Sequence, residues 1–390
     1  MNARAYLDWN ATAPLRPQAR AVMTETLDLA GNPSSVHAEG RAARVAVERA
    51  RAQVAALVGA DAGQVTFTSG GTEANMMALS PAWSASKPEM GHTGFARLLV
   101  SAIEHPSAGQ GGRFPADRIE TIPVTAQGIV DLDTLKAQLQ AGGLSLVSVM
   151  LANNETGVIQ PIRAIADLIH ASDGLLHVDA VQGPGRIPCD INALGADLLT
   201  ISGHKLGGPK GTGALVRHER LHLSDPLIRG GGQERGLRAG TEDVAAIAGF
   251  GAAAEAAAAA RKTDAAGMSR LQERLEAGIR AATPEAIIFG QDAARLPNTT
   301  LFTHSGLKAE TAVIAFDLEG VAVSSGSACS SGKVQPSHVL AAMGAEAGLA
   351  RGAIRISTGY ATGEAQIDHC LKAWIKLSET LLKGRTIIAA

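Results

Sequence analysis

This chain of 390 residues contains few cysteines and no large excess of positive or negative charge. The three cysteines, Cys189, Cys329 and Cys370, are too few and too scattered for a disulfide framework or a CxxC metal site. At least one thiol must therefore be unpaired within the chain. The formal net charge is -2 and no basic tail is present, so the sequence carries no electrostatic footprint for direct nucleic-acid binding.

Long apolar runs are missing as well. The first residues, MNARAYLDWNATAP, lack the basic region and apolar run of a secretory signal, and no apolar stretch reaches transmembrane length. We therefore expect a cytoplasmic protein that makes no membrane contact. With 46% hydrophobic and 18% charged residues, the chain has the composition of a folded globular protein that is too long for one small core. Two domains are expected.

Helical and β-rich segments alternate along the first part of the chain. Helix-like periodicity covers about 17–30, 40–59 and 72–84. Strand candidates lie between and after these helices, at 65–68, 98–100, 146–149, 175–178, 198–201 and 214–216. This alternation predicts an α/β fold with a mostly parallel central sheet that is covered on both faces.

The composition changes after residue 241. From Glu242 to about Ala282 the sequence predicts a long alanine-rich helix or two, followed by short strands at 300–303, 321–324 and 353–357 that mix with helices. We place the domain boundary in this region. A nominal GxGxxA at Gly249 lies inside the expected helix and not after a strand, so we interpret it as helix packing and not as a dinucleotide site.

Polar clusters follow two neighbouring strands of the expected sheet. DAVQ, at 179–182, comes after one strand, and SGHK, at 202–205, comes after the next. Because parallel strands end at the same edge, where ligands bind, these side chains are expected to converge. The Lys205 amine could form an imine with an aldehyde, and the Asp179 carboxylate could keep a pyridine nitrogen protonated. These are the requirements of pyridoxal phosphate.

A glycine-rich turn adds a place for a phosphate. TSGGTEAN, at 68–75, runs from a strand into a helix, where free backbone N–H groups and the Thr72 hydroxyl meet the positive helix N-terminus. Its spacing does not match GxxxxGK[ST], so a nucleotide-binding P-loop is not indicated. The segment GGPKGTG after Lys205 does not match that pattern either.

Cys329 lies in a segment of small residues, SSGSACSSG at 324–332, which we expect to be exposed. An unpaired thiol is usually a buried small apolar group, and this interpretation suits Cys189 and Cys370 in their more apolar surroundings. For Cys329 we predict a nucleophile. With an ordinary pKa of about 8.5, only a few per cent of it would be thiolate at neutral pH, so it needs a base or cation that the sequence does not identify.

A series of motifs from Tyr6 to Tyr360 resembles the cysteine desulfurases of the NifS/IscS type. In chain order these are YLDWNATAP, GNPSSVHAEGRAAR, FTSGGTEAN, EHPS, NNETG, HVDAVQ, SGHKLGGPKGTG, RAGTED, SSGSACSSG and IRISTGY. The resemblance implies the aminotransferase class V family, with the type I fold of pyridoxal-phosphate-dependent transferases. It also implies a homodimer with a large cofactor domain at 13–255 and a smaller α+β domain made of 1–12 and 256–390.

The resemblance also implies roles for matching residues. Lys205 would carry pyridoxal 5'-phosphate as a Schiff base, Asp179 would pair with the pyridine nitrogen, and Gln182 would contact the ring hydroxyl. His105 would stack on the ring and move protons. The remaining assignments are the phosphate site, formed by Gly71, Thr72, Ser202 and His204 with Thr241 of the other subunit, and the substrate site, formed by Arg355, Asn153 and Asn10.

The implied reaction converts L-cysteine to L-alanine and leaves the sulfur on Cys329 as a persulfide. The sulfur would then pass to an acceptor, such as an iron–sulfur scaffold protein, for cluster assembly or another thiolation. The SSGSACSSG segment resembles the long-loop group of the family, whereas Ile356 and the following Gly359-Tyr360 depart from the common IRFS-glycine-arginine pattern. A second basic contact at that place is therefore in question.

Two alternatives to this function remain at the level of sequence. A selenocysteine lyase, or another β-carbon lyase of the same fold, would use Lys205 and Asp179 equally well. A non-enzymatic RNA-binding module could be argued from RGGGQERGLRAG at 229–240, but the net charge and the lack of interleaved aromatic residues disfavour it.

Overall fold

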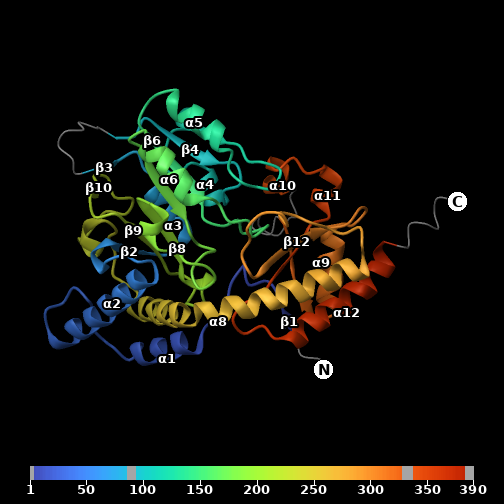
Figure 1. Cartoon of the computed structure of the whole chain (residues 1–390). Coiled ribbons are helices and arrows are strands. Elements are labelled where there is room, and N and C mark those ends of the chain that lie inside the picture. Colours follow the sequence, from blue (N-terminus) through green and yellow to red (C-terminus); the bar gives the residue numbers. More distant parts are fainter. Residues whose placement is uncertain (1–3, 86–93, 327–336, 383–390) are drawn as a thin grey trace.

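The computed structural model describes residues 4–85, 94–326 and 337–382 (Figure 1). Its main sheet has seven strands in the order β2-β9-β8-β7-β6-β4-β5. Neighbours from β8 to β5 pair in parallel, and β9 is antiparallel to β2 and β8, which confirms the mostly parallel sheet. The strands are β2 (Val65–Thr68), β4 (Arg97–Ser101), β5 (Ile119–Ile122), β6 (Ser145–Met150), β7 (Leu175–Asp179), β8 (Leu198–Ser202) and β9 (Gly213–Arg217).

Helices cover both faces of this sheet. One face packs against α2, α5, α6 and the long helix α8 (Val244–Ala282) through Val47, Leu135, Ile165 and Phe250, and the other packs against α3 through Met77. Burial on both faces explains why these strands are almost continuous apolar runs. The helices of this part are α1 (Pro17–Thr26), α2 (Ala38–Leu57), α3 (Gly71–Ala78), α4 (Pro106–Gly109), α5 (Leu132–Gln140), α6 (Ile162–His170) and α7 (Ile191–Leu194), and the 3-10 turns are η1 (Ala62–Gln64), η2 (Ala116–Arg118), η3 (Gly203–Lys205) and η4 (Gln233–Gly236).

The helix expected at 72–84 is shorter than predicted. It ends at Ala78, and Trp83–Ala85 forms β3, which pairs antiparallel with β10 (Leu221–Leu223). Pro81 explains the early end, because proline donates no backbone hydrogen bond and disfavours helical geometry in the residue before it.

The alanine-rich segment forms one helix, α8 (Val244–Ala282), which extends along one side of the molecule from α1 and α2 to α12 (Glu364–Leu381) (Figure 1). A Cβ on Gly249 would lie 2.3 Å from Met23, and one on Gly251 would lie 2.5 Å from Ala50. These glycines therefore permit close helix contacts, which supports the packing interpretation of GxGxxA. Although α8 is long and apolar enough to cross a membrane, 56% of its most apolar window is buried inside this protein.

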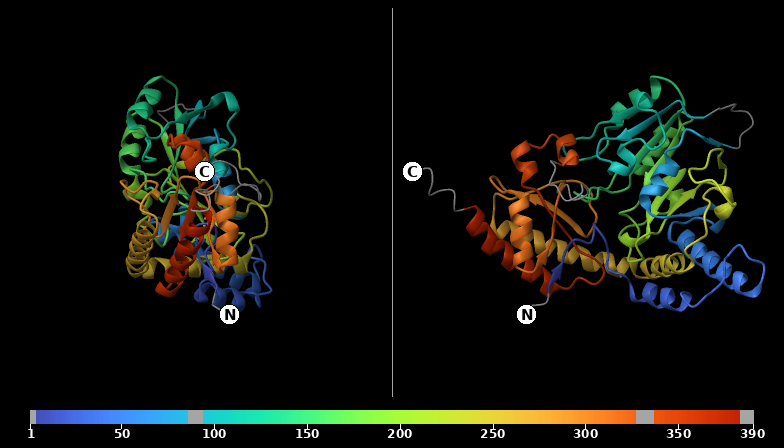
Figure 2. Two further views of the ribbon diagram at one scale, coloured as in Figure 1. Left: turned by 90° about the vertical axis from the view of Figure 1, so that its right-hand side faces the viewer. Right: turned by 180° about the vertical axis from the view of Figure 1, so that it is seen from behind.

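A second, four-stranded antiparallel sheet lies in the C-terminal part of the chain (Figure 2). Its order is β11-β12-β15-β14, and β1 (Ala5–Tyr6) pairs in parallel with the nearby β13 (Val321–Ala322). The sheet strands are β11 (Ile287–Ile288), β12 (Thr299–Thr303), β14 (Ser324–Ser325) and β15 (Ile354–Ser357), and the helices are α9 (Ala309–Leu318), α10 (His338–Ala342), α11 (Ala347–Arg351) and α12.

The two ends of the chain share an apolar core. Ala5 and Leu7 pack with residues from Leu271 to Leu377, whereas a separate core under the main sheet extends only to Ala257. These cores lie on opposite sides of the expected boundary at 255/256 to within a few residues. The division into domains itself stays a prediction.

Candidate functional site

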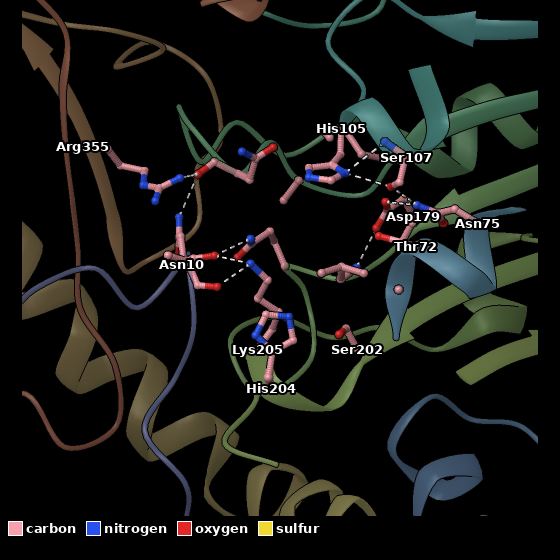
Figure 3. A pocket seen from close by; sticks show the side chains of 17 residues that line it. Asn10, Thr72, Asn75, His105, Ser107, Asp179, Ser202, His204, Lys205 and Arg355 are labelled. Carbon is pink, nitrogen blue, oxygen red and sulfur yellow. Dashed lines mark hydrogen bonds between the residues drawn. The ribbon is translucent and has the colours of Figure 1, made fainter. Parts of the chain in front are cut away.

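A cavity of about 320 Å³ lies at the carboxyl ends of β7 and β8, with Arg355 of β15 at one side (Figure 3). Its wall is therefore built from both sheets. It brings together most of the residues that the sequence singled out, namely Asn10, Gly71, Thr72, His105, Asp179, Gln182, Ser202, His204, Lys205 and Arg355. The convergence predicted from the strand ends is confirmed.

Two of the predicted site residues that the structure describes, Asn153 and Thr241, do not line this cavity. The Asn153 side chain stabilises its own turn, because Oδ1 accepts from the backbone N–H groups of Glu155 (2.9 Å) and Thr156 (3.0 Å). Its neighbour Asn154 lines the cavity instead. The structure thus places the Asn153 side chain in a turn next to the cavity lining, and its role toward the substrate stays a prediction. Thr241 is exposed and does not line the cavity of its own subunit, and Cys329 lies outside the described residues.

Asp179 is held by a side chain to which the sequence assigned no role. Nδ2 of Asn75 donates to Asp179 Oδ2 at 2.8 Å and to Ser107 Oγ at 2.9 Å, and the N–H of Val181 donates to Asp179 Oδ1 at 3.0 Å. Asn75 and Ser107 both line the cavity. The only sequence signal for them was their presence in FTSGGTEAN and EHPS. The carboxylate is thereby fixed in one orientation, as a partner for a protonated ring nitrogen must be.

His105 continues this network. Its Nδ1 lies 2.8 Å from Ser107 Oγ and accepts from the Ser107 N–H at 3.2 Å, so a neutral ring carries its proton on Nε2. Burial lowers the pKa of His105; nearby Lys205 and His338 lower it further, while Asp179 opposes them. The imidazole is therefore neutral at neutral pH and can accept a proton.

Lys205 lies in η3, directly after β8, and its amine points into the cavity (Figure 3). Nζ donates to two backbone carbonyls of the N-terminal segment, those of Asn10 at 2.5 Å and Ala11 at 2.9 Å. The first residues of the chain thus contact the amine that the resemblance assigns to the cofactor. This contact explains why Asn10 belongs to the site.

Arg355 reaches the same cavity from β15. Nη2 donates to Asp8 Oδ1 at 2.7 Å and Nη1 donates to the carbonyl of Asn154 at 3.0 Å, and the side chain is buried. Its Nε is buried without a hydrogen-bond partner in the described part of the chain. A guanidinium with an unsatisfied N–H in a cavity suits a carboxylate ligand.

The residues assigned to the phosphate also fit an anion. Gly71 and Thr72 form the N-terminus of α3, and Ser202 Oγ is buried without a hydrogen-bond partner among the described residues. Burial, followed by the charges of Lys205 and Lys210, lowers the pKa of His204 to about 4, so the ring is neutral and can donate one N–H. Together with Lys205 and the fixed carboxylate of Asp179, these groups fit pyridoxal phosphate.

Cys189 and Cys370 are both buried, as the sequence predicted. Burial raises the pKa of each thiol to about 12. Both thiols therefore stay protonated at neutral pH and cannot act as nucleophiles.

Glu155 is a buried acid beside the site. Oε2 accepts from Ser337 Oγ at 2.6 Å, and Arg355 is close enough to favour its charge, but burial outweighs both and raises its pKa from 4.5 to about 7. A buried carboxyl whose pKa is raised in the folded state is disfavoured as the anion, so the folded state loses stability while the unfolded state already ionises.

We therefore expect the contribution of Glu155 to the stability of this protein to fall by about 3 kcal/mol as the pH rises from about 4.5 to about 7. Above pH 7 this contribution changes no further. Glu155→Gln keeps the shape and cannot ionise, so the difference in unfolding free energy between the two proteins should grow across that window. Urea unfolding of both at pH 5 and pH 7.5 measures it, and parallel curves for the two proteins would contradict it.

Two charged side chains of the RGGGQERGLRAG segment form ion pairs with the rest of the protein. Glu234 is buried and accepts a bidentate pair of hydrogen bonds from Arg51 at 2.6 and 2.8 Å. Arg238 pairs with Glu73 at 2.9 Å. These side chains hold the segment against α2 and α3, which gives the RNA-binding alternative no support.

The comparisons with known proteins agree on one family. The family model for aminotransferase class V matches residues 5–370. A cysteine desulfurase of Cereibacter sphaeroides is 40% identical over 375 residues, covering 95% of this chain and 94% of that protein. The cysteine desulfurase IscS of Dictyoglomus turgidum is 38% identical, with 98% and 96% coverage.

Solved structures agree. A NifS-like protein from Rickettsia africae superposes with a TM-score of 0.87 at 37% identity, and the match covers 96% of this chain and 99% of that one. A second NifS-like protein gives a TM-score of 0.85 at 31% identity, with 97% and 100% coverage. The chain therefore belongs to the aminotransferase class V family of pyridoxal-phosphate-dependent enzymes, among the cysteine desulfurases.

Proposed function

We propose that this protein converts L-cysteine to L-alanine and transfers the sulfur to Cys329. The observation that carries the proposal is the single cavity in which Lys205, the fixed Asp179 carboxylate and Arg355 meet. The relatives described above are named cysteine desulfurases, which gives the selenocysteine lyase alternative no support.

The residues of the cavity have separate roles in the proposed reaction. Pyridoxal phosphate, when bound, supplies a ring that withdraws electrons from the substrate's α-carbon. Arg355 binds the substrate carboxylate, and its pairing with Asp8 fixes the guanidinium for this task. The Lys205 amine moves the proton of the α-carbon, and neutral His105 accepts and returns a second proton.

Cys329 accepts the sulfur in this proposal. Its thiolate attacks the substrate sulfur, an S–S bond forms, and the bond between that sulfur and the β-carbon breaks. The electron pair of the broken bond stays with the β-carbon and takes up a proton, which yields alanine. One thiol and one cysteine thus give one persulfide and one alanine, with no external oxidant or reductant.

Cys329→Ala tests this step. We expect alanine formation from L-cysteine to fall by at least about 1000-fold, because a nucleophile is lost, while the absorbance of bound cofactor stays unchanged. Cys370→Ala is the matched control, since it also removes one thiol but a buried one, and should keep its activity. Full activity of Cys329→Ala would contradict the assignment of Cys329 as the nucleophile.

We further propose a cytoplasmic homodimer in which Thr241 completes the phosphate site of the other subunit, and a protein acceptor for the sulfur, such as an iron–sulfur scaffold. The exposed position of Thr241 outside its own cavity supports the shared site. Sedimentation of the holoenzyme tests the dimer. Mixing Lys205→Ala subunits, which are inactive alone, with Thr241→Ala subunits, in which cofactor binding is weakened, should give a mixed dimer with one complete site.

A further inference from the structure

Arg186 is a buried cation behind the wall of the cavity. Its exposed fraction is 6%, and no carboxylate lies within 4.0 Å of its guanidinium among the residues that the structure describes. Burial lowers its pKa to about 10, with a further contribution from the charge of Arg355. The side chain therefore remains charged at neutral pH, and a buried charge must be compensated by hydrogen bonds.

Those hydrogen bonds go to the residues of the site. Nη1 donates to the backbone carbonyl of Gln182 at 2.9 Å and also to the side-chain oxygen of Gln182. Nη2 lies 3.5 Å from the backbone carbonyl of Lys205. Arg186 thus contacts Gln182 and Lys205, which line the cavity, but does not line the cavity itself.

These contacts determine which way the Gln182 amide faces. Its oxygen accepts from Arg186, and its Nε2 donates to the carbonyl of Asn10 at 3.1 Å, the same carbonyl that accepts from Lys205. The reversed amide would set its NH₂ against the guanidinium and its oxygen against the Asn10 carbonyl. Both contacts would then be repulsive, because a guanidinium has no acceptor and a carbonyl has no donor.

We propose that Arg186 is a positioning residue for the cofactor site, which fixes the Gln182 amide so that only its N–H groups serve as donors on the cavity side. One N–H of this amide bonds to Asn10, and the other makes no hydrogen bond in the described part of the chain. Polarisation of the amide oxygen by the guanidinium also strengthens these donors. The inference rests on the proposed function, in which Gln182 contacts the ring oxygen of pyridoxal phosphate.

The visible spectrum of bound pyridoxal phosphate as a function of pH tests this proposal in the holoenzyme. In Arg186→Met, the donor to the ring oxygen weakens, so the protonated, cationic chromophore should be favoured and the spectral midpoint should rise. We expect a rise of about one pH unit. Arg16→Met is the matched control, because Arg16 is equally buried and donates to the carbonyl of Leu206, next to Lys205, but does not contact Gln182. Its midpoint should not move.

A double-mutant cycle separates the amide from the charge itself. If Arg186 acts through Gln182, then Arg186→Met should shift the midpoint much less in a Gln182→Ala background than in the wild type. An equal shift in both backgrounds, or an equal shift in Arg16→Met, would overturn the proposal. If Arg186→Met does not fold, Arg186→Lys replaces it throughout; this variant keeps the charge but not the planar fork, so a shift of the same sign but smaller size is expected.

The failure of this inference differs from failure of the proposed function. A wild-type protein that gains no visible band with pyridoxal phosphate would contradict the function. A wild-type protein with that band, and an Arg186→Met variant with the same midpoint, would contradict only the role of Arg186.

Discussion

Lys205→Ala is expected to abolish desulfuration, with a loss of at least about 10,000-fold in kcat, because the amine serves both as the attachment point of the cofactor and as the group that moves the α-proton. Lys205 lines the cavity, and its Nζ donates hydrogen bonds to the carbonyls of Asn10 and Ala11. Borohydride reduction followed by peptide mapping measures the attachment directly. The wild type should retain the cofactor on the peptide that contains Lys205, and the variant should retain none.

Lys210→Ala is the matched control for this change. Lys210 is exposed, lies in the same glycine-rich segment, and does not line the cavity. It should keep both the reduced cofactor and the activity. Retention of covalently bound cofactor by Lys205→Ala would show that another amine holds it, and the site would have to be reassigned.

Arg355→Lys is expected to lower kcat/KM for L-cysteine by about 100-fold. The guanidinium presents donors in a planar fork, of which one pairs with Asp8 and another with Asn154, while Nε has no partner among the described residues. A lysine ammonium cannot hold Asp8, Asn154 and a substrate carboxylate in that geometry, and two charge-assisted hydrogen bonds to the substrate are lost or weakened. The effect should appear mainly in KM, since the carboxylate is bound before and during the reaction.

Cysteamine, which lacks the carboxylate, provides the control within the same protein. If Arg355 binds the carboxylate, wild type and Arg355→Lys should bind cysteamine equally well, as measured by the change in the cofactor spectrum. Weaker binding of cysteamine by the variant would indicate a general distortion of the site. Unchanged KM for L-cysteine would place the carboxylate elsewhere.

The two predictions concern opposite walls of one cavity. Lys205 and Asp179 come from the edge of the main sheet, and Arg355 comes from the C-terminal sheet. The N-terminal segment joins them, because Asn10 contacts Lys205, Gln182 and the carbonyl of Asn154, whose oxygen also accepts from Arg355. Cofactor and substrate groups are thus held by parts of the chain that are far apart in sequence.

Much of the site could be predicted from local patterns. Asp179 and Lys205 follow neighbouring buried strands, and parallel strands end at one edge, so their convergence needed no tertiary information. The helix expected at 72–84 ends earlier than predicted for an equally local reason, namely the presence of Pro81. The phosphate role of Thr72 was indicated by the glycine-rich turn before a helix, whereas the roles of His105 and Arg355 came from the resemblance of their motifs and not from their spacing.

Other parts of the site depend on contacts between distant segments. Asn153 and Asn154 are adjacent and chemically identical, yet the turn buries the first and turns the second toward the cavity. The sequence had no means to separate them, since which amide satisfies the turn depends on the backbone dihedral angles. The same is true of Asn75, whose bond to Asp179 spans 104 residues.

The sequence by itself determined the chemistry of this protein: an amine and a carboxylate at one sheet edge, a glycine-rich turn for an anion, and one cysteine among small residues. Residue type and strand order suffice for that, because they decide which reactive groups exist and which end of the sheet they reach. Only the tertiary structure decided how these groups are oriented, through the pairs Asn75 with Asp179 and Asp8 with Arg355. Orientation is set by hydrogen bonds across the folded chain, and no local pattern specifies their partners.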